Sequence, residues 1–153
     1  KKYKIILEPS KKNTAAAILS SALIKRIDSK QALMFFSADH LIGKFDIIKK
    51  NIVKNIKKLD DKNIIIFGIK PSFPSNEFGY FKMNSNGSVN RFIEKPKNKT
   101  AIKIIKQKAL WNSGMFFIRK DSLIKNYKKY QPLIFKNCYE SMVRSKQKKK
   151  QNF

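Results

Sequence analysis

Four short segments of the chain carry side chains that could bind a phosphorylated ligand. They are Glu-Pro-Ser-Lys-Lys-Asn-Thr-Ala at 8–15, Ser-Ala-Asp-His at 37–40, Phe-Ile-Glu-Lys-Pro at 92–96 and Leu-Trp-Asn-Ser-Gly-Met-Phe at 110–116. Each lies at or near the point where an expected strand gives way to a loop. In open α/β sheets, ligands bind at the carboxyl ends of the strands. The positions of these segments therefore indicate a binding site.

Asp39 follows the apolar run 31–36 directly. A carboxylate at a strand end can hold Mg²⁺ against substrate phosphates, because Mg²⁺ prefers oxygen ligands and takes only one or two carboxylates from a protein. The segment alone equally allows Asp39 to cap the following turn. We expect the neighbouring His40 to form structural hydrogen bonds rather than to catalyse a reaction.

Glu94 and Lys95 place a carboxylate beside an ammonium group, which suits a ligand that has both hydroxyls and a phosphate. A surface ion pair at a strand end is the alternative. Pro96 favours an extended backbone at Lys95, so the two side chains should point to opposite sides unless the chain bends there.

The other two segments add polar groups suited to a sugar and to a purine base. Asn112 offers both a donor and an acceptor to a sugar hydroxyl, and Gly114 allows a close backbone approach. A turn into a core strand, with Trp111 packed inside, is the alternative. Glu8 can accept hydrogen bonds from N1–H and the exocyclic amine of guanine, and the start of the helix that follows favours anions. That segment can equally be a simple capped loop.

Hydrophobic patterning predicts the elements that position these segments. Strands are expected at 2–7, 31–36 (buried and central), 63–69 and 115–118, with a hairpin of 80–83 and 89–93 around the Asn-Ser-Asn-Gly turn at 84–87. Helices are expected at 14–25 (capped by Thr14), 46–58, 100–108, 121–129 and 133–146. This alternation predicts one α/β domain, with a mostly parallel sheet and helices on both faces.

The composition limits the classes of protein. The 153 residues carry a net charge of +25, with 31 Lys and only 4 Arg. Specific phosphate and base readout favours Arg, so we expect no specific nucleic-acid partner. A lysine-rich nucleic-acid-binding module stays the alternative. The single Cys and single His exclude a disulfide framework and multi-histidine metal sites. No apolar run is long enough to cross a membrane and no signal peptide is evident, so the expected location is the cytoplasm, without a membrane partner.

Taken together, the segments resemble the mannose-1-phosphate guanylyltransferases, in the bacterial form that is often fused to a phosphomannose isomerase domain. The matching residues, in chain order, are Glu8-Pro9 with Lys12-Asn13-Thr14-Ala15, Ala38-Asp39-His40, Phe67-Gly68-Ile69 with Pro71 and Pro74, Gly79-Tyr80, Phe92 with Glu94-Lys95-Pro96, and Trp111 to Phe116. The resemblance covers about residues 3–145. The sequence departs from the family pattern at Lys12, Ala16, Glu77 and Phe78.

The resemblance implies a Rossmann-like nucleotide-sugar transferase fold and a reaction of GTP with mannose 1-phosphate that yields GDP-mannose and pyrophosphate. It implies Mg²⁺ held by Asp39, which is catalytic together with Lys95 on the sugar phosphate. It further implies a set of sugar-side residues, namely Gly79, Tyr80, Glu94, Lys95, Asn112 and Ser113. It implies a nucleotide-side set as well, namely Glu8, Asn13, Thr14, Ser37 and Ala38. Another sugar-1-phosphate nucleotidyltransferase is the alternative within this fold.

The resemblance also implies that residues 1–153 are part of a larger nucleotidyltransferase domain, incomplete at both ends. Family members open with a Gly-rich phosphate-binding loop and later supply a second metal-binding Asp, and neither sequence is present here. We therefore expect these 153 residues alone to have little activity. A homo-oligomer and a fused isomerase domain are further expectations for the full protein.

Overall fold

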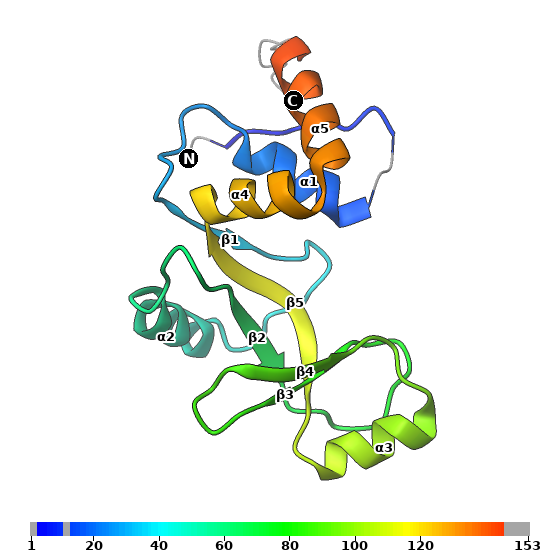
Figure 1. Cartoon of the computed structure of the whole chain (residues 1–153). Coiled ribbons are helices and arrows are strands. Elements are labelled where there is room, and N and C mark those ends of the chain that lie inside the picture. Colours follow the sequence, from blue (N-terminus) through cyan, green and yellow to red (C-terminus); the bar gives the residue numbers. More distant parts are fainter. Residues whose placement is uncertain (1–2, 11–12, 146–153) are drawn as a thin grey trace. The chain divides into compact units, whose positions relative to one another are not determined.

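The computed structural model describes residues 3–10 and 13–145 (Figure 1). In chain order the elements are α1 (Asn13–Ala22), β1 (Ala32–Phe35), α2 (Phe45–Ile56), β2 (Ile65–Ile69), β3 (Tyr80–Met83), β4 (Val89–Ile93), α3 (Asn98–Lys106), β5 (Leu110–Arg119), α4 (Lys120–Tyr130) and α5 (Pro132–Arg144). No helix among them is long and apolar enough to span a membrane. The expected helices at 14–25, 46–58, 100–108, 121–129 and 133–146 are all present with shifted ends, and the part of the last one at residue 146 lies outside the described residues.

The strands form one five-stranded sheet in which β5 pairs with β1, β2 and β3. The order is β1-β5-β3-β4, and β2 also pairs with β5. The pairings β2–β5, β3–β4 and β3–β5 are antiparallel, so the prediction of a mostly parallel sheet was wrong. Apolar side chains indicate that a strand is covered by other parts of the protein, and antiparallel strands can be covered as well as parallel ones. The apolar runs therefore predicted strands correctly but could not give their direction.

The hairpin of β3 and β4 is confirmed. Tyr80 pairs with Ile93 and Phe81 with Phe92. In the turn, the Gly87 N–H donates to the carbonyl of Asn84 at 3.0 Å, and Gly87 has φ of +84°, which suits glycine at this position of a tight turn. This hairpin fixes the end of β4, where Glu94 and Lys95 follow.

Two strand predictions differ from the structure. Of the strand expected at 2–7, residue 2 lies outside the described residues and residues 3–7 form no strand; Tyr3, Ile5 and Leu7 are all exposed. High β propensity makes a strand only where a partner accepts its hydrogen bonds, and none of the described strands pairs with this segment. β1 is present but half-buried along its length and stands at one end of the sheet order, so it is neither buried nor central.

The predicted cap at Thr14 also differs, because α1 begins one residue earlier, at Asn13. Asn13 has φ of +63°, a left-handed conformation that Asn tolerates better than most residues. Asn13 therefore makes the turn into the helix.

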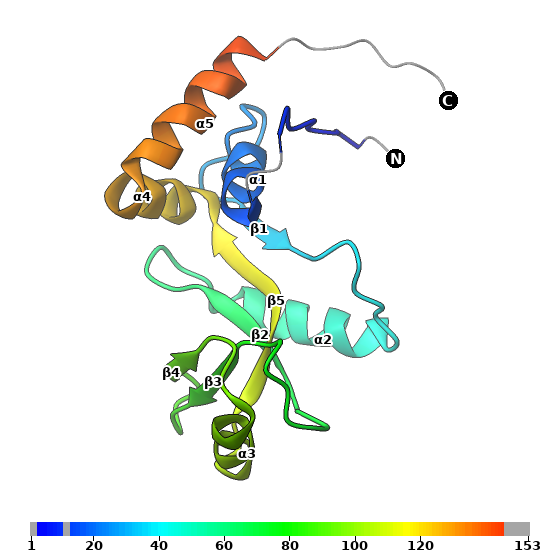
Figure 2. The same ribbon diagram turned by 90° about the vertical axis from the view of Figure 1, so that its right-hand side faces the viewer.

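The chain divides into two compact units. The first comprises Lys1–Leu33, Ile56–Asn63 and Ile118–Phe153, and the second comprises Met34–Asn55 and Ile64–Phe117. In the first, α1 packs on α4 and α5 around the buried Leu19 and Ala22 (Figure 2). In the second, Tyr80 packs against Ala101 and Ile104 of α3 and against Ala109, which follows that helix.

Candidate functional site

The second unit holds the residues expected at the sugar side and at the metal. Gly79 and Tyr80 enter β3, Glu94 and Lys95 follow β4, and Asn112 and Ser113 lie in β5. Ser37, Ala38 and Asp39 follow β1 in the same unit. The remaining nucleotide-side residues, Glu8, Asn13 and Thr14, lie in the first unit.

Gly79, Glu94 and Asn112 come from three separate segments and meet in the structure. A Cβ at Gly79 would lie 2.7 Å from Oε2 of Glu94, so the carboxylate fills the space that a side chain would take. On the β5 side, the backbone N–H of Asn112 donates to the carbonyl of Gly79 at 2.7 Å. The Asn112 side-chain Oδ1 accepts a hydrogen bond from the N–H of Gly114 at 3.2 Å. These contacts bring together three residues that the family resemblance assigns to one ligand.

Lys95 does not adopt the extended backbone that Pro96 favours, so that expectation was wrong. Its φ is +41°, in the left-handed region that few residues other than glycine occupy. The chain bends at Glu94 and Lys95 as it leaves β4, and both side chains are exposed while Pro96 is buried. Such strain is found most often at functional sites.

Tyr80 and Ser113 are buried, and their hydroxyls bond to the backbone. The Tyr80 hydroxyl accepts from the N–H of Ser75 at 2.9 Å and donates to its carbonyl at 3.0 Å, which ties the loop 70–79 to β3. The Ser113 hydroxyl donates to the carbonyl of Phe67 at 2.9 Å and accepts from the N–H of Met115 at 3.1 Å. Both residues hold the local backbone, and a direct substrate contact by either stays a prediction.

Trp111 is the centre of an aromatic cluster beside Asn112. The rings of Phe73 and Phe78 meet it edge-on, at centroid distances of 5.1 and 4.9 Å. Its Nε1 is buried and has no hydrogen-bond partner among the described residues. Phe73 and Phe78 are both exposed, so the cluster lies at the surface next to Asn112. As the only tryptophan in the chain, Trp111 is also a natural fluorescent reporter.

Asp39 lies in an exposed turn after β1, followed by His40, which is exposed as well. Nearby, the hydroxyl of Ser37 lies 3.8 Å from the Cβ position of Gly114, which has φ of +72°. No group of three or more His, Cys, Asp or Glu side chains in the described part of the chain could hold a metal by itself. A lone carboxylate at Asp39 still fits Mg²⁺, since the phosphates of a ligand and water supply most of its other oxygen ligands.

Two surface hollows are described, and neither contains any of these residues. One lies along α4 and is lined by Ser29, Asp121, Ile124, Lys125, Lys128 and Lys129. The other lies along α2 and is lined by Asp46, Lys49, Lys50, Val53 and Lys54. Both are open lysine-lined helix flanks without convergent polar groups. A cleft shared by Asp39 with Glu94 and Lys95 stays a prediction.

At the nucleotide side, Glu8 is exposed in a segment without regular structure, while Asn13 and Thr14 form the exposed start of α1. The expected strand-to-helix loop therefore has its helix but not its strand. The backbone N–H groups at such a helix start remain suitable for an anion.

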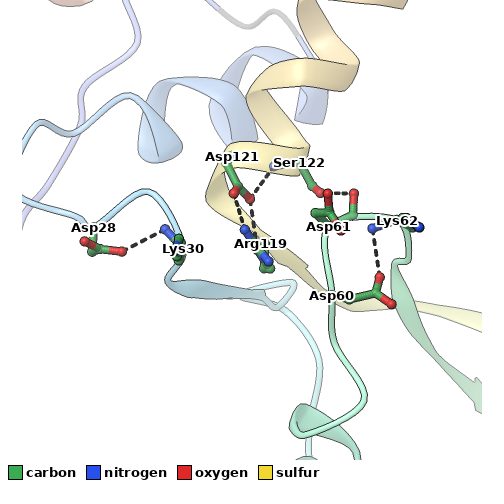
Figure 3. Close-up of polar contacts among 8 residues, drawn as sticks. All are labelled: Asp28, Lys30, Asp60, Asp61, Lys62, Arg119, Asp121 and Ser122. Carbon is green, nitrogen blue, oxygen red and sulfur yellow. Dashed lines mark hydrogen bonds and ion pairs between the residues drawn. The ribbon is translucent and has the colours of Figure 1, made fainter.

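Sequence reasoning missed a polar cluster in the first unit, at the start of α4 (Figure 3). Arg119 donates to Asp121 through two nitrogens, one of them at 3.0 Å. This hydrogen bonding lowers the pKa of Asp121 and raises that of Arg119. The Ser122 hydroxyl donates to the carbonyl of Asp61, which ties the loop at 60–63 to α4. The only signal in the sequence was an Arg-Lys-Asp-Ser run at an expected helix start. The cluster stabilises the start of α4 and its contact with the loop at 60–63.

Comparison with known proteins shows the family of the chain. The family model for "Nucleotidyl transferase" matches residues 1–153. The mannose-1-phosphate guanylyltransferase of Escherichia coli is 35% identical over 151 residues, covering 90% of this chain and 32% of that protein. The xanthan biosynthesis protein XanB of Xanthomonas campestris pv. campestris (strain B100) is 32% identical over 142 residues, covering 90% of this chain and 30% of that protein.

A solved structure is similar to this chain in both fold and sequence. The crystal structure of mannose-6-phosphate isomerase from Helicobacter pylori has a TM-score of 0.80 and 35% sequence identity, covering 90% of this chain and 53% of that one. The chain belongs to the nucleotidyl transferase family. It spans about a third of the length of the curated relatives that it matches.

Proposed function

We propose that the protein makes GDP-mannose. The phosphate oxygen of mannose 1-phosphate attacks the α-phosphorus of GTP, a new P–O bond forms, and pyrophosphate leaves. One observation carries the proposal: Glu94 fills the space at Gly79 while Asn112 hydrogen-bonds to the Gly79 carbonyl. The sugar-side residues of the mannose-1-phosphate guanylyltransferase pattern are thus neighbours in one compact unit, and the named relatives support the same substrate.

Binding and charge neutralisation account for most of the catalysis in such a transfer. Glu94 accepts hydrogen bonds from mannose hydroxyls, and the Asn112 side-chain amide donates to another. The Lys95 ammonium belongs to the next residue along the chain and neutralises the sugar phosphate. Tyr80 and Ser113 keep these residues in place through their backbone hydrogen bonds.

Asp39 is the proposed ligand of the divalent metal, Mg²⁺. The bound ion neutralises phosphate charge and increases the electrophilicity of the phosphorus. Ser37 and Ala38 provide backbone and hydroxyl groups next to it. Glu8, Asn13 and Thr14 hold the guanine end, where the carboxylate of Glu8 accepts from the N1–H and the exocyclic amine of the base.

The relatives suggest the setting of this reaction. XanB is named for xanthan biosynthesis, so we propose that the GDP-mannose produced supplies mannose to a polysaccharide. A fused isomerase region is proposed for the full-length protein, in line with the name of the Helicobacter pylori structure. We place the protein in the cytoplasm, where GTP is made.

The test is pyrophosphate release by the full-length gene product, incubated with GTP, mannose 1-phosphate and Mg²⁺. We expect Asp39→Asn to abolish turnover and to leave the thermal unfolding midpoint unchanged. ATP, CTP and UTP in competition with GTP, and glucose 1-phosphate in competition with mannose 1-phosphate, report the base and the sugar.

Three results would count against the proposal. Preference for another base or sugar would assign the protein to a different sugar-1-phosphate nucleotidyltransferase. Full turnover in the Asp39→Asn variant would remove the proposed metal ligand. Absence of turnover together with tight, salt-sensitive binding of nucleic acid would favour the nucleic-acid-binding module.

A further inference from the structure

Gly79 has an ordinary backbone conformation, which raises the question of why a glycine stands there. The described residues with a left-handed φ include Gly87 and Gly114, but Gly79 is not one of them. An L-residue could therefore adopt the backbone of Gly79 without torsional strain. Any need for glycine at this position must come from the space around it.

That space is already occupied. A Cβ at Gly79 would lie 2.7 Å from Oε2 of Glu94 and 2.8 Å from Cζ of Phe92. Non-bonded heavy atoms are best separated by about 3.5–4.0 Å when they involve carbon. Both clashing atoms are the outer ends of side chains, so an added methyl group would displace the carboxylate and the ring without breaking the backbone.

The strand register explains the contact. Tyr80 pairs with Ile93 in the antiparallel hairpin, so Gly79 and Glu94 are the next facing pair beyond the last one. Side chains of facing residues on antiparallel strands lie about 4.5–5.5 Å apart at their Cβ atoms. With glycine at one position, the side chain at the other can fold across the strand, and the Glu94 carboxylate does so.

We infer that Gly79 is a positioning residue for Glu94: its missing side chain creates the space in which the Glu94 carboxylate meets the sugar hydroxyls. This inference rests on the proposed function and assigns Gly79 an indirect role, in contrast to a direct approach of its backbone to the ligand. The Asn112 N–H fixes the carbonyl of the same residue. The Glu94 carboxylate and the backbone of Asn112 are thus both in contact with the same residue, Gly79.

The experiment compares mannose 1-phosphate binding by four forms of the full-length gene product and follows it by isothermal titration calorimetry. The forms are wild type, Gly79→Ala, Glu94→Gln and the double variant. Gly43→Ala is the matched control, because a Cβ at Gly43 has no atom within 4 Å. We expect roughly tenfold weaker binding in each single variant, as for the loss of one hydrogen bond to a charged group. The double variant should bind no more weakly than either single one.

Several results would overturn the inference. Multiplying effects in the double variant would mean that Gly79 contacts the ligand independently of Glu94. Wild-type affinity in Gly79→Ala would mean that the space is not needed. Recovery of affinity on adding Phe92→Leu to Gly79→Ala would assign the effect to the ring instead of the carboxylate. A large fall in the thermal midpoint of Gly79→Ala would indicate a structural role alone.

A second measurement separates this inference from the proposed function. If wild type binds no mannose 1-phosphate, the proposed function fails, and the position of the carboxylate can still be followed without ligand. The ¹³C resonance of the Glu94 carboxyl, assigned by its loss in Glu94→Gln, should shift in Gly79→Ala and stay unchanged in Gly43→Ala. An unchanged resonance in Gly79→Ala would refute the positioning role.

Discussion

Replacing Tyr80 by Phe removes one oxygen atom and tests how the loop 70–79 is held. The Tyr80 side chain is 1% exposed, and its hydroxyl makes two hydrogen bonds with the backbone of Ser75, which is itself 8% exposed. Phe keeps the ring and its packing at α3. The variant loses two hydrogen bonds of about 1 kcal/mol each and leaves a buried N–H and carbonyl without partners, so we expect the free energy of unfolding to fall by about 2–3 kcal/mol.

Urea unfolding followed by Trp111 fluorescence measures this loss. An unchanged m value, the slope of the free energy of unfolding against urea concentration, would show that only stability changed. Faster amide hydrogen exchange should be confined to residues 70–79 and the adjoining end of β3. Tyr130→Phe is the control, because that side chain is 63% exposed. A loss below about 0.5 kcal/mol, equal to that of an ordinary surface substitution, would refute the view that this hydroxyl closes the loop.

Three further predictions concern the stability of each unit by itself. Lys120→Met should lower the free energy of unfolding by about 2–3 kcal/mol in a urea titration, because the buried Lys120 ammonium donates to two carbonyls after α1 at 3.1 and 2.7 Å. The hydrogen bonds from Arg119 lower the pKa of Asp121 in the folded protein. Their pairing therefore stabilises the folded state fully above a pH of about 4, and this stabilisation is lost at more acidic pH. In urea titrations at decreasing pH, the free energy of unfolding of Asp121→Asn should fall less steeply than that of the wild type. Gly68→Ala should cost about 1–3 kcal/mol by the same titration, since its Cβ would lie 2.6 Å from the Phe81 ring.

Local chemistry made parts of the fold predictable from the sequence. The Asn-Gly turn specified the hairpin, and the helices followed from their apolar spacing. The relative direction of the strands was not predictable, because an apolar run can form a strand in a parallel or in an antiparallel pair. The full length of β5 was hidden as well, since Trp111 to Gly114 has the composition of a turn although these residues continue the strand.

The candidate site shows a similar division. The family resemblance implied that Gly79, Glu94 and Asn112 serve one ligand; the structure brings these three residues together, and their ligand contacts stay a prediction. The sequence did not predict the left-handed backbone of Lys95, because the preference set by a following proline is a statistical one that tertiary structure can override. Nor did it predict the bonding of the Tyr80 hydroxyl, since hydrogen bonds to a loop backbone leave no pattern in sequence spacing.

The late position of β5 in the chain constrains how the protein can be synthesised. β1 and β2 both pair with β5, so they emerge from the ribosome well before the strand that pairs with them. During that interval their apolar edges are open to aggregation or to chaperones, whereas β3 and β4 can close on each other at once. A nascent chain that has been released from the ribosome as far as α3 should therefore carry a formed hairpin and two unpaired strands, and the sheet should be completed only when residues 110–119 have been released as well.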